Sequence, residues 1–174
     1  TTRDVAYYVI DKHGRIEHEV WFEAPYSAMI HDCALTKDYM VFPIMPYTSD
    51  LERLKSGGPH FVYDGSLPQV FGVIPRYGKA QDVRWFKGPQ ACPTHTVNAF
   101  DEDGKIVFDL TETDGNAFGP VVPDRDGKVP APGSVTTRLV RWHIDYHAKS
   151  DQLSPAQREV LAVVVDLLAL VEDG

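Results

Sequence analysis

The chain lacks several features that would place it at once in a familiar class of proteins. Its 174 residues include only two cysteines, Cys33 and Cys92, which excludes a disulfide-stapled scaffold and favours reduced, buried thiols in a cytoplasmic protein. The net charge is −8 and basic residues do not cluster, so no nucleic-acid partner is expected. No membrane span is expected either, because the longest apolar run, residues 160–171, is interrupted by Asp166.

Sequence signatures of several enzyme classes are missing as well. The chain contains no G-x-S-x-G nucleophile motif, no phosphate-binding G-x-x-x-x-G-K-[ST] loop and no dinucleotide-binding G-x-G-x-x-G motif. It also lacks the H-E-x-x-H zinc motif, and neither cysteine belongs to a C-x-x-C pair. Serine hydrolase, nucleotide-dependent and common zinc chemistries therefore have no support in local motifs.

What the sequence does contain is a series of short β-rich segments separated by turns. Asp103-Gly104 supplies the positive φ angles of a tight hairpin turn, and Gly14 marks another turn. The segment 39–46 is apolar throughout, as expected of a strand buried on both faces. The segments expected to be strands are 5–11, 16–23, 28–36, 39–46, 60–64, 69–76, 82–88, 95–100, 105–110 and 135–148. This pattern predicts an all-β sandwich, barrel or propeller.

The remaining segments are a short helical turn, a long loop and the tail. Residues 50–58 predict a helical turn that ends at two glycines, and 115–134 form a loop rich in proline and glycine. We divide the chain into a β-rich part, 1–150, and a tail, 151–174. Ser154 and Pro155 fit the start of a helix, but the tail equally fits a β-branched run.

Seven histidines are the main candidates for chemistry, and two of them stand apart. His31 and His95 each lie in an apolar predicted strand beside small residues. A buried imidazole needs a partner for both nitrogens, so each histidine could be a satisfied core residue. Alternatively, the two could converge from separate hairpins on one metal ion, with the second nitrogen of each bonded to a carboxylate or carbonyl group.

At these two histidines the sequence resembles the carotenoid cleavage oxygenases. "SAMIHDCALTKDYMVFPIMP" (27–46) is similar to the segment around the family's second histidine, and "ACPTHTVNAFDEDGKIVFDL" (91–110) to the segment around its third. "GVIPR" (72–76) and "TTRLVRWHIDY" (136–146) match the strands between and after them. The resemblance covers residues 1–148 and is closest to the lignostilbene dioxygenase branch.

The resemblance implies a fold, a metal and a reaction. Members of this family are seven-bladed β-propellers, and this chain would form about three of the blades. A ferrous ion, Fe(2+), lies on the propeller axis and is held by four histidines, of which His31 and His95 would be two. The family cleaves a conjugated C=C bond with O₂ into two carbonyl products. The expected partners are therefore O₂ and a hydrophobic or phenolic alkene, such as a stilbene or apocarotenoid.

Residues near the two histidines have expected roles of their own. We expect the Thr36 hydroxyl to bond nearby backbone, Asp32 to accept a backbone amide and support a turn, and Asn98 to pin the hairpin. Phe71, Trp85 and Phe100 are expected in the core rather than in a substrate wall.

The chain also departs from the family pattern. Two of the four ligand histidines lie outside it, as do the residues that bind a phenolic hydroxyl in the lignostilbene branch. The tail lacks the family's Glu-Phe-Pro-Arg segment, although Asp166 lies in that region. The isolated chain is therefore expected to be inactive, and its open sheet edges invite oligomers. Two alternatives remain: a non-catalytic propeller fragment or binding module with core histidines, and a zinc hydrolase that uses Asp32.

Overall fold

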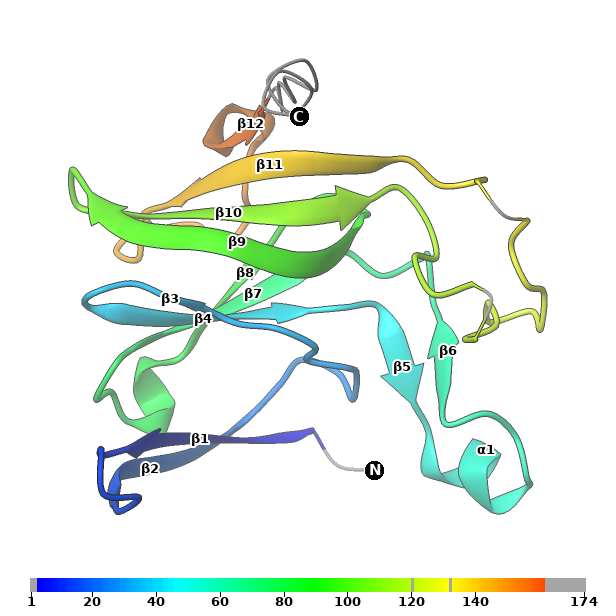
Figure 1. Cartoon of the computed structure of the whole chain (residues 1–174), viewed down its shortest axis with the longest axis horizontal. Helices are drawn as coiled ribbons and strands as arrows, with labels where there is room; N and C mark the ends of the chain where they lie inside the picture. The colour runs from blue at the N-terminus through cyan, green and yellow to red at the C-terminus, as the bar shows by residue number, and fades with distance from the viewer. Residues whose placement is uncertain (1–2, 120, 132, 162–174) are drawn as a thin grey trace, which may run out of the picture.

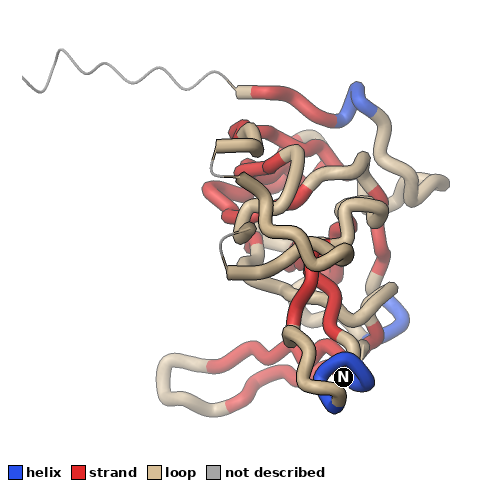
Figure 2. The backbone as a smooth tube through the Cα atoms, turned by 90° about the vertical axis from the view of Figure 1, so that its right-hand side faces the viewer, coloured by secondary structure: helices blue, strands red, loops and turns tan. Residues whose placement is uncertain are grey.

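A computed structural model describes residues 3–119, 121–131 and 133–161, and these form an almost entirely β structure. Most of the regular elements in the backbone trace are strands, and the helical segments are short turns (Figure 2). The strands are β1 Asp4–Ile10, β2 Ile16–Glu23, β3 Ala34–Leu35, β4 Tyr39–Ile44, β5 Tyr47–Ser49, β6 Phe61–Tyr63, β7 Val70–Pro75, β8 Arg84–Lys87, β9 Cys92–Glu102, β10 Lys105–Thr113, β11 Thr137–Ile144 and β12 Arg158–Val160. The helical turns are α1 Leu51–Lys55, η1 Ala80–Asp82 and η2 Pro155–Gln157.

The strands form stacked layers (Figure 1). The upper layer is a four-stranded antiparallel sheet in the order β9-β10-β11-β12, and the middle layer is a second one in the order β3-β4-β7-β8. The β1-β2 hairpin forms the lower layer, and the β5-β6 pair lies at one end. Two four-stranded sheets and a two-stranded hairpin agree with the expectation of about three propeller blades.

The main core lies between the two four-stranded sheets. Phe71 and Phe86 of the middle sheet pack against residues of the upper sheet such as Phe108 and Trp142, and all four are essentially inaccessible to solvent. Phe42 and Ile74, on the other face of the middle sheet, pack against the β1-β2 hairpin. The middle sheet is therefore buried on both faces, which confirms the prediction made from the apolar segment 39–46.

Local turn chemistry explains how the hairpins close. Asp103 and Gly104 have φ angles of 48° and 73°, which confirms the predicted tight turn between β9 and β10. Residues 50–58 form the predicted helical turn, with the Asp50 side chain accepting from the Arg53 amide and Gly57 at φ 82°. Gly72 is required by packing, because a Cβ there would meet the Trp85 ring at 2.4 Å.

Three expectations need correction. The predicted strand 28–36 is mostly irregular, and only Ala34 and Leu35 form β3. The backbone of Met29 is hydrogen-bonded to Met45 and Tyr47 instead, at the corner between β4 and β5. His31 and His95 are exposed rather than buried, since they lie at sheet edges that face no further sheet in the described residues. Cys33 is exposed, and only Cys92 is a buried thiol.

The tail is described only as far as residue 161. Ser154 and Pro155 begin a single 3₁₀ turn, and β12 then pairs with β11. The helical alternative for residues 162–174, and the comparison of Asp166 with the family's glutamate, lie outside the described residues.

Candidate metal centre

The two singled-out histidines come together at the edge where the two four-stranded sheets meet. His31 precedes β3, the edge strand of the middle sheet, and His95 lies on β9, the edge strand of the upper sheet. Their ring centres are 5.0 Å apart with an interplanar angle of 64°, although 64 positions separate them in the chain. The structure therefore brings together the pair that the sequence selected.

The spacing of the rings fits two imidazoles that share one metal ion. A metal bonded to an imidazole nitrogen at about 2.1 Å lies about 3.2 Å from the ring centre. Two such ligands at about 90° around one ion would hold their ring centres about 4.5 Å apart. The observed 5.0 Å is close to this value. Neutral imidazole nitrogens suit a divalent transition metal such as iron, so the donor type fits as well.

The backbone at His95 is irregular, which affects how the ring is presented. The pairing of β9 with β10 shifts register on both sides of Leu110, so β9 is bulged around His95. The His95 amide donates to the Thr111 hydroxyl at 3.1 Å instead of to a ladder carbonyl. Bulges of this kind re-aim a side chain at the rim of a sheet.

Asp32 connects the segments that carry the two histidines. Its Oδ2 accepts the Thr96 amide at 2.9 Å, and its Oδ1 accepts the Cys33 amide at 2.7 Å. Burial alone would raise the pKa of Asp32, but these amides and the nearby His95 together bring it below its usual value. The predicted hydrogen bond from a backbone amide to Asp32 is confirmed. One of the two amides belongs to Thr96, 64 positions along the chain, so the contact is not confined to a turn.

The Asp32 carboxylate also faces the ring of His95. Asp32 Oδ2 lies 3.9 Å from His95 Nδ1, too far for a direct hydrogen bond but close enough for electrostatic attraction to an N–H group. A proton held on Nδ1 leaves Nε2 as the free donor atom for a metal.

The ring of His31 has an aromatic neighbour from the long loop after β10. Phe118 lies edge-on to His31, with ring centres 5.6 Å apart. The buried Tyr47 fixes this loop, because its hydroxyl donates to Asn116 Oδ1 at 2.9 Å and accepts the Phe118 amide at 3.0 Å. Burial raises the pKa of Tyr47, so the hydroxyl stays protonated. Neither Phe118 nor Tyr47 was predicted from the sequence. Phe118 lies in a loop rich in proline and glycine, which carries no periodic signal, and Tyr47 of β5 contacts that loop only through the fold.

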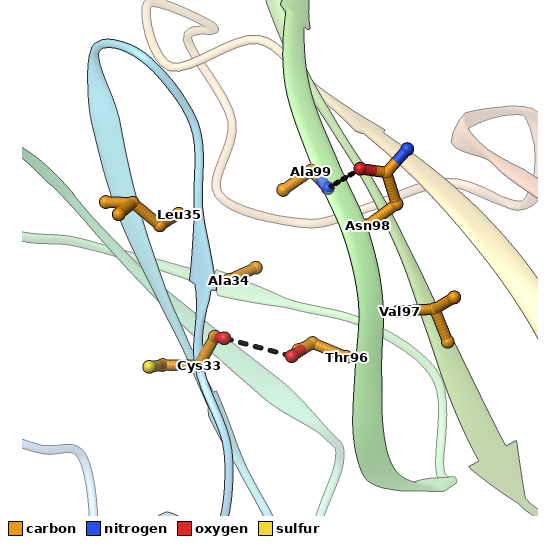
Figure 3. Close-up of a pocket in the computed structure, with 7 residues that line it drawn as sticks. All are labelled: Cys33, Ala34, Leu35, Thr96, Val97, Asn98 and Ala99. Atoms are coloured by element: carbon orange, nitrogen blue, oxygen red, sulfur yellow. Dashed lines mark hydrogen bonds between the residues drawn. The ribbon is translucent and has the colours of Figure 1, made fainter.

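A small hollow of about 210 Å³ lies between β3 and β9, and it is lined by residues that follow the two histidines in the chain and not by the histidines themselves. The side chains of Ala34 and Ala99 are small, and Figure 3 shows the Thr96–Cys33 hydrogen bond across the gap between the strands. The lining residues are Cys33, Ala34, Leu35, Thr96, Val97, Asn98 and Ala99. The Asn98 side chain accepts the adjacent Ala99 amide at 3.0 Å, so it supports the strand locally.

Other predicted roles near the site can be compared with the structure. The buried Thr36 hydroxyl accepts the amides of Asp38 and Tyr39, which confirms its structural role. Phe71 is fully buried and Trp85 packs against the lower core, as expected. Phe100 is only half-buried, and the guanidinium carbon of Arg141 lies over its ring, 5.4 Å from the ring centre.

The described residues do not complete a metal site by themselves. Among them, no group of three or more His, Cys, Asp or Glu side chains is arranged to hold a metal ion. Of the other histidines, His143 pairs with Glu159 at 3.0 Å on the upper sheet. His18 contacts the Gly78 carbonyl oxygen at 3.0 Å on the lower layer. If further protein segments supplied the remaining ligands, this chain would contribute two histidines at a sheet edge.

No helix among the described residues has the length and apolar character needed to cross a bilayer.

Comparisons with known proteins show the family to which the chain belongs. A family model described as retinal pigment epithelial membrane protein matches residues 1–167. The chain is 41% identical to isoeugenol monooxygenase of Pseudomonas nitroreducens, over 87% of its own length and 31% of that protein. It is 39% identical to lignostilbene-alpha,beta-dioxygenase isozyme III of Sphingomonas paucimobilis, over 90% of its own length and 32% of that protein.

Solved structures lead to the same group. The crystal structure of lignostilbene dioxygenase from Pseudomonas brassicacearum matches with a TM-score of 0.82 and 50% identity, over 87% of this chain and 32% of that one. An apocarotenoid oxygenase from Synechocystis shares the fold, with a TM-score of 0.68 at 22% identity, over 90% of this chain and 32% of that one. The chain thus spans about a third of the length of the relatives it matches.

Proposed function

Because this chain belongs to the carotenoid cleavage oxygenase family, we propose that the full-length protein is a non-haem iron oxygenase. It would cleave a conjugated C=C bond with O₂ to give two carbonyl products. The names of the relatives refer to isoeugenol and lignostilbene, which are phenolic compounds with a conjugated double bond. A phenolic alkene is therefore the proposed substrate class, in preference to an apocarotenoid.

One observation carries this proposal: His31 and His95 lie with ring centres 5.0 Å apart at the edge where two blade-like sheets meet. Ferrous iron, when bound, would supply the redox-active centre at which O₂ is activated towards the alkene. His31 and His95 would be two of its ligands. Asp32 would favour the Nδ1–H form of His95 and so keep Nε2 available for the metal.

The alternatives are less well supported by the same contacts. A zinc hydrolase would use Asp32 as a ligand or base, but each of its carboxylate oxygens accepts a backbone amide, which makes it a weaker base. A binding module with core histidines would pair both imidazole nitrogens inside the protein, whereas among the described residues the His31 ring packs against the rings of His95 and Phe118.

Metal analysis tests the proposed ligands. The full-length protein, purified without oxygen, is expected to hold about one equivalent of iron, and His31→Ala and His95→Ala should each lose most of it because a ligand is removed. His13→Ala is the matched control, since His13 lies in the turn between β1 and β2. Folded protein that keeps its iron in both ligand variants would contradict the assignment, and zinc in place of iron would favour a hydrolase.

An activity assay tests the reaction and the substrate class. The iron-loaded protein is expected to cleave a 4-hydroxystilbene in air into two aldehydes and to consume one O₂ per turnover. Cleavage of an apocarotenal alone would move the protein to the carotenoid branch. If iron-loaded protein cleaves neither compound, the proposed reaction is wrong.

A further inference from the structure

The residue after each candidate ligand is bonded to the residue after the other. Asp32 follows His31, Thr96 follows His95, and the Thr96 amide donates to Asp32 Oδ2 at 2.9 Å. The Thr96 hydroxyl donates to the Cys33 carbonyl oxygen at 2.9 Å, which adds a second bond between the same segments (Figure 3). We call these two hydrogen bonds the Asp32–Thr96 link.

Regular strand pairing does not set the distance between the two histidines. His31 lies in irregular backbone before β3, and β3 and β9 belong to different sheets. On β9 the ladder to β10 is bulged at His95, whose amide is held by the Thr111 side chain. The two ligand segments are therefore joined to each other by side-chain hydrogen bonds and not by ladder pairing.

We propose that Asp32 and Thr96 are positioning residues that set the distance and orientation of His31 and His95 for the shared metal ion. This inference rests on the proposed function. Partners that orient metal ligands typically contribute a factor of about 10–100 to metal affinity. The Asp32–Thr96 link has this effect on both ligands at once, because each of its members is covalently next to one histidine.

The link is a separate feature from the packing that holds the two sheets together. The sheets share a large core centred on Phe71, Phe108 and Trp142. They are also joined by the buried Glu112 carboxylate, which accepts from Gln69 at 3.0 Å and from the Arg158 guanidinium at 2.9 and 2.6 Å. Loss of the Asp32–Thr96 link should therefore leave the fold intact and change the metal site.

A matched set of Thr96 variants tests the role of the hydroxyl. Thr96→Val keeps the shape of the side chain but cannot donate to the Cys33 carbonyl oxygen, whereas Thr96→Ser can. In the full-length, Fe²⁺-loaded protein, Thr96→Val is expected to lose iron to a chelator about tenfold faster than wild type. Thr96→Ser should restore a rate within about twofold of wild type.

Asp32→Asn tests the carboxylate. The amide group can accept only one of the two backbone N–H groups, so iron loss should accelerate by about tenfold or more. The visible spectrum of the Co²⁺-substituted protein reports ligand geometry, and it should change in Asp32→Asn and in Thr96→Val but not in Thr96→Ser. Glu112→Gln is the control for general destabilisation, because it weakens the core and leaves the link intact.

The outcomes distinguish the positioning role of Asp32 and Thr96 from the proposed function. If His31→Ala and His95→Ala lose iron while Asp32→Asn and Thr96→Val keep wild-type release rates and Co²⁺ spectra, the positioning role is wrong and the proposed function stands. If the histidine variants keep iron, the proposed function fails first. If Glu112→Gln accelerates iron loss as much as Thr96→Val does, the effect reflects stability and the positioning role is again contradicted.

Discussion

Two carboxylates join the same pair of sheets in opposite ways. Glu112 is almost fully buried, and its oxygens accept from the side chains of Gln69, Trp142 and Arg158. The Asp32 side chain is one-third exposed, and its oxygens accept two backbone amides beside the candidate metal centre. Glu112 is hydrogen-bonded in the buried interior between the sheets, whereas Asp32 is hydrogen-bonded at their edge.

The difference shows how one fold separates stability from function. A buried charge is tolerated only with a complete set of partners, so the Glu112 site is rigid and has no spare coordination capacity. At the sheet edge, two imidazoles lie with ring centres 5.0 Å apart, and hydrogen bonds to backbone groups join the segments that carry them. The comparison predicts that changes at Glu112 lower stability and that changes at Asp32 alter metal binding.

The largest expected effect on stability is that of Glu112→Ala. This change leaves the Arg158 guanidinium and the Trp142 N–H group without their acceptor inside the protein, which should cost about 3–5 kcal/mol of unfolding free energy. Urea denaturation of the full-length protein measures it. Glu17→Ala, on the exposed side of β2, should stay within about 0.5 kcal/mol of wild type. If Glu112→Ala loses no more stability than Glu17→Ala, Glu112 does not stabilise the contact between the sheets.

A third carboxylate, Asp64, should show an intermediate and pH-dependent effect. Burial raises the pKa of Asp64, but the Ser66 hydroxyl and amide and the Arg125 guanidinium outweigh it, so the pKa lies below its usual value. A carboxyl group whose pKa is lowered by folding contributes stability above its unfolded pKa of about 3.9, and this is lost as the pH falls through the folded value. Asp64→Asn should therefore cost about 1–2 kcal/mol at pH 7.

The pH profile of Asp64→Asn provides the check. The stability difference from wild type should shrink as the pH falls below about 4, because the wild-type carboxyl group becomes protonated. Asp4→Asn, on the exposed edge of β1, is the control and should show no such convergence. A difference that stays constant from pH 7 to pH 3 would mean that the charge of Asp64 is not what stabilises this corner.

The smallest expected effect is that of Thr36→Val, in the turn between β3 and β4. The variant loses the hydroxyl that accepts the Asp38 and Tyr39 amides at 3.2 and 2.9 Å, at a cost of about 1 kcal/mol. Thermal unfolding measures the loss, and Thr36→Ser should remain near wild type because it keeps the acceptor. Iron content should be unchanged in both variants. A loss of iron in Thr36→Val would extend the metal-positioning role beyond Asp32 and Thr96.

Local patterns predicted much of the fold. The Asp103-Gly104 turn, the helical turn at 50–58 and the doubly buried segment 39–46 all follow from short-range chemistry, and the structure confirms them. Family resemblance added the propeller, and the comparisons support it. These features could be predicted because each depends on residues that are close together in the chain.

The environment of the candidate site could not be predicted in the same way. His31 was expected inside a regular buried strand, but its backbone is irregular and its ring exposed. Asp32 was expected to support a turn, whereas its carboxylate reaches Thr96, 64 positions away. Phe118 reaches His31 from a loop without periodicity. Contacts of this kind depend on how the sheets stack, and one sequence alone does not encode that stacking in a local pattern.

The most direct test of the metal assignment is the location of iron in crystals of the full-length protein. Anomalous diffraction measured on both sides of the iron absorption edge shows where the metal lies, independently of activity. The account predicts a single iron peak about 2.1 Å from a ring nitrogen of both His31 and His95. An iron peak that contacts neither ring, in protein that is fully loaded with iron, would contradict it.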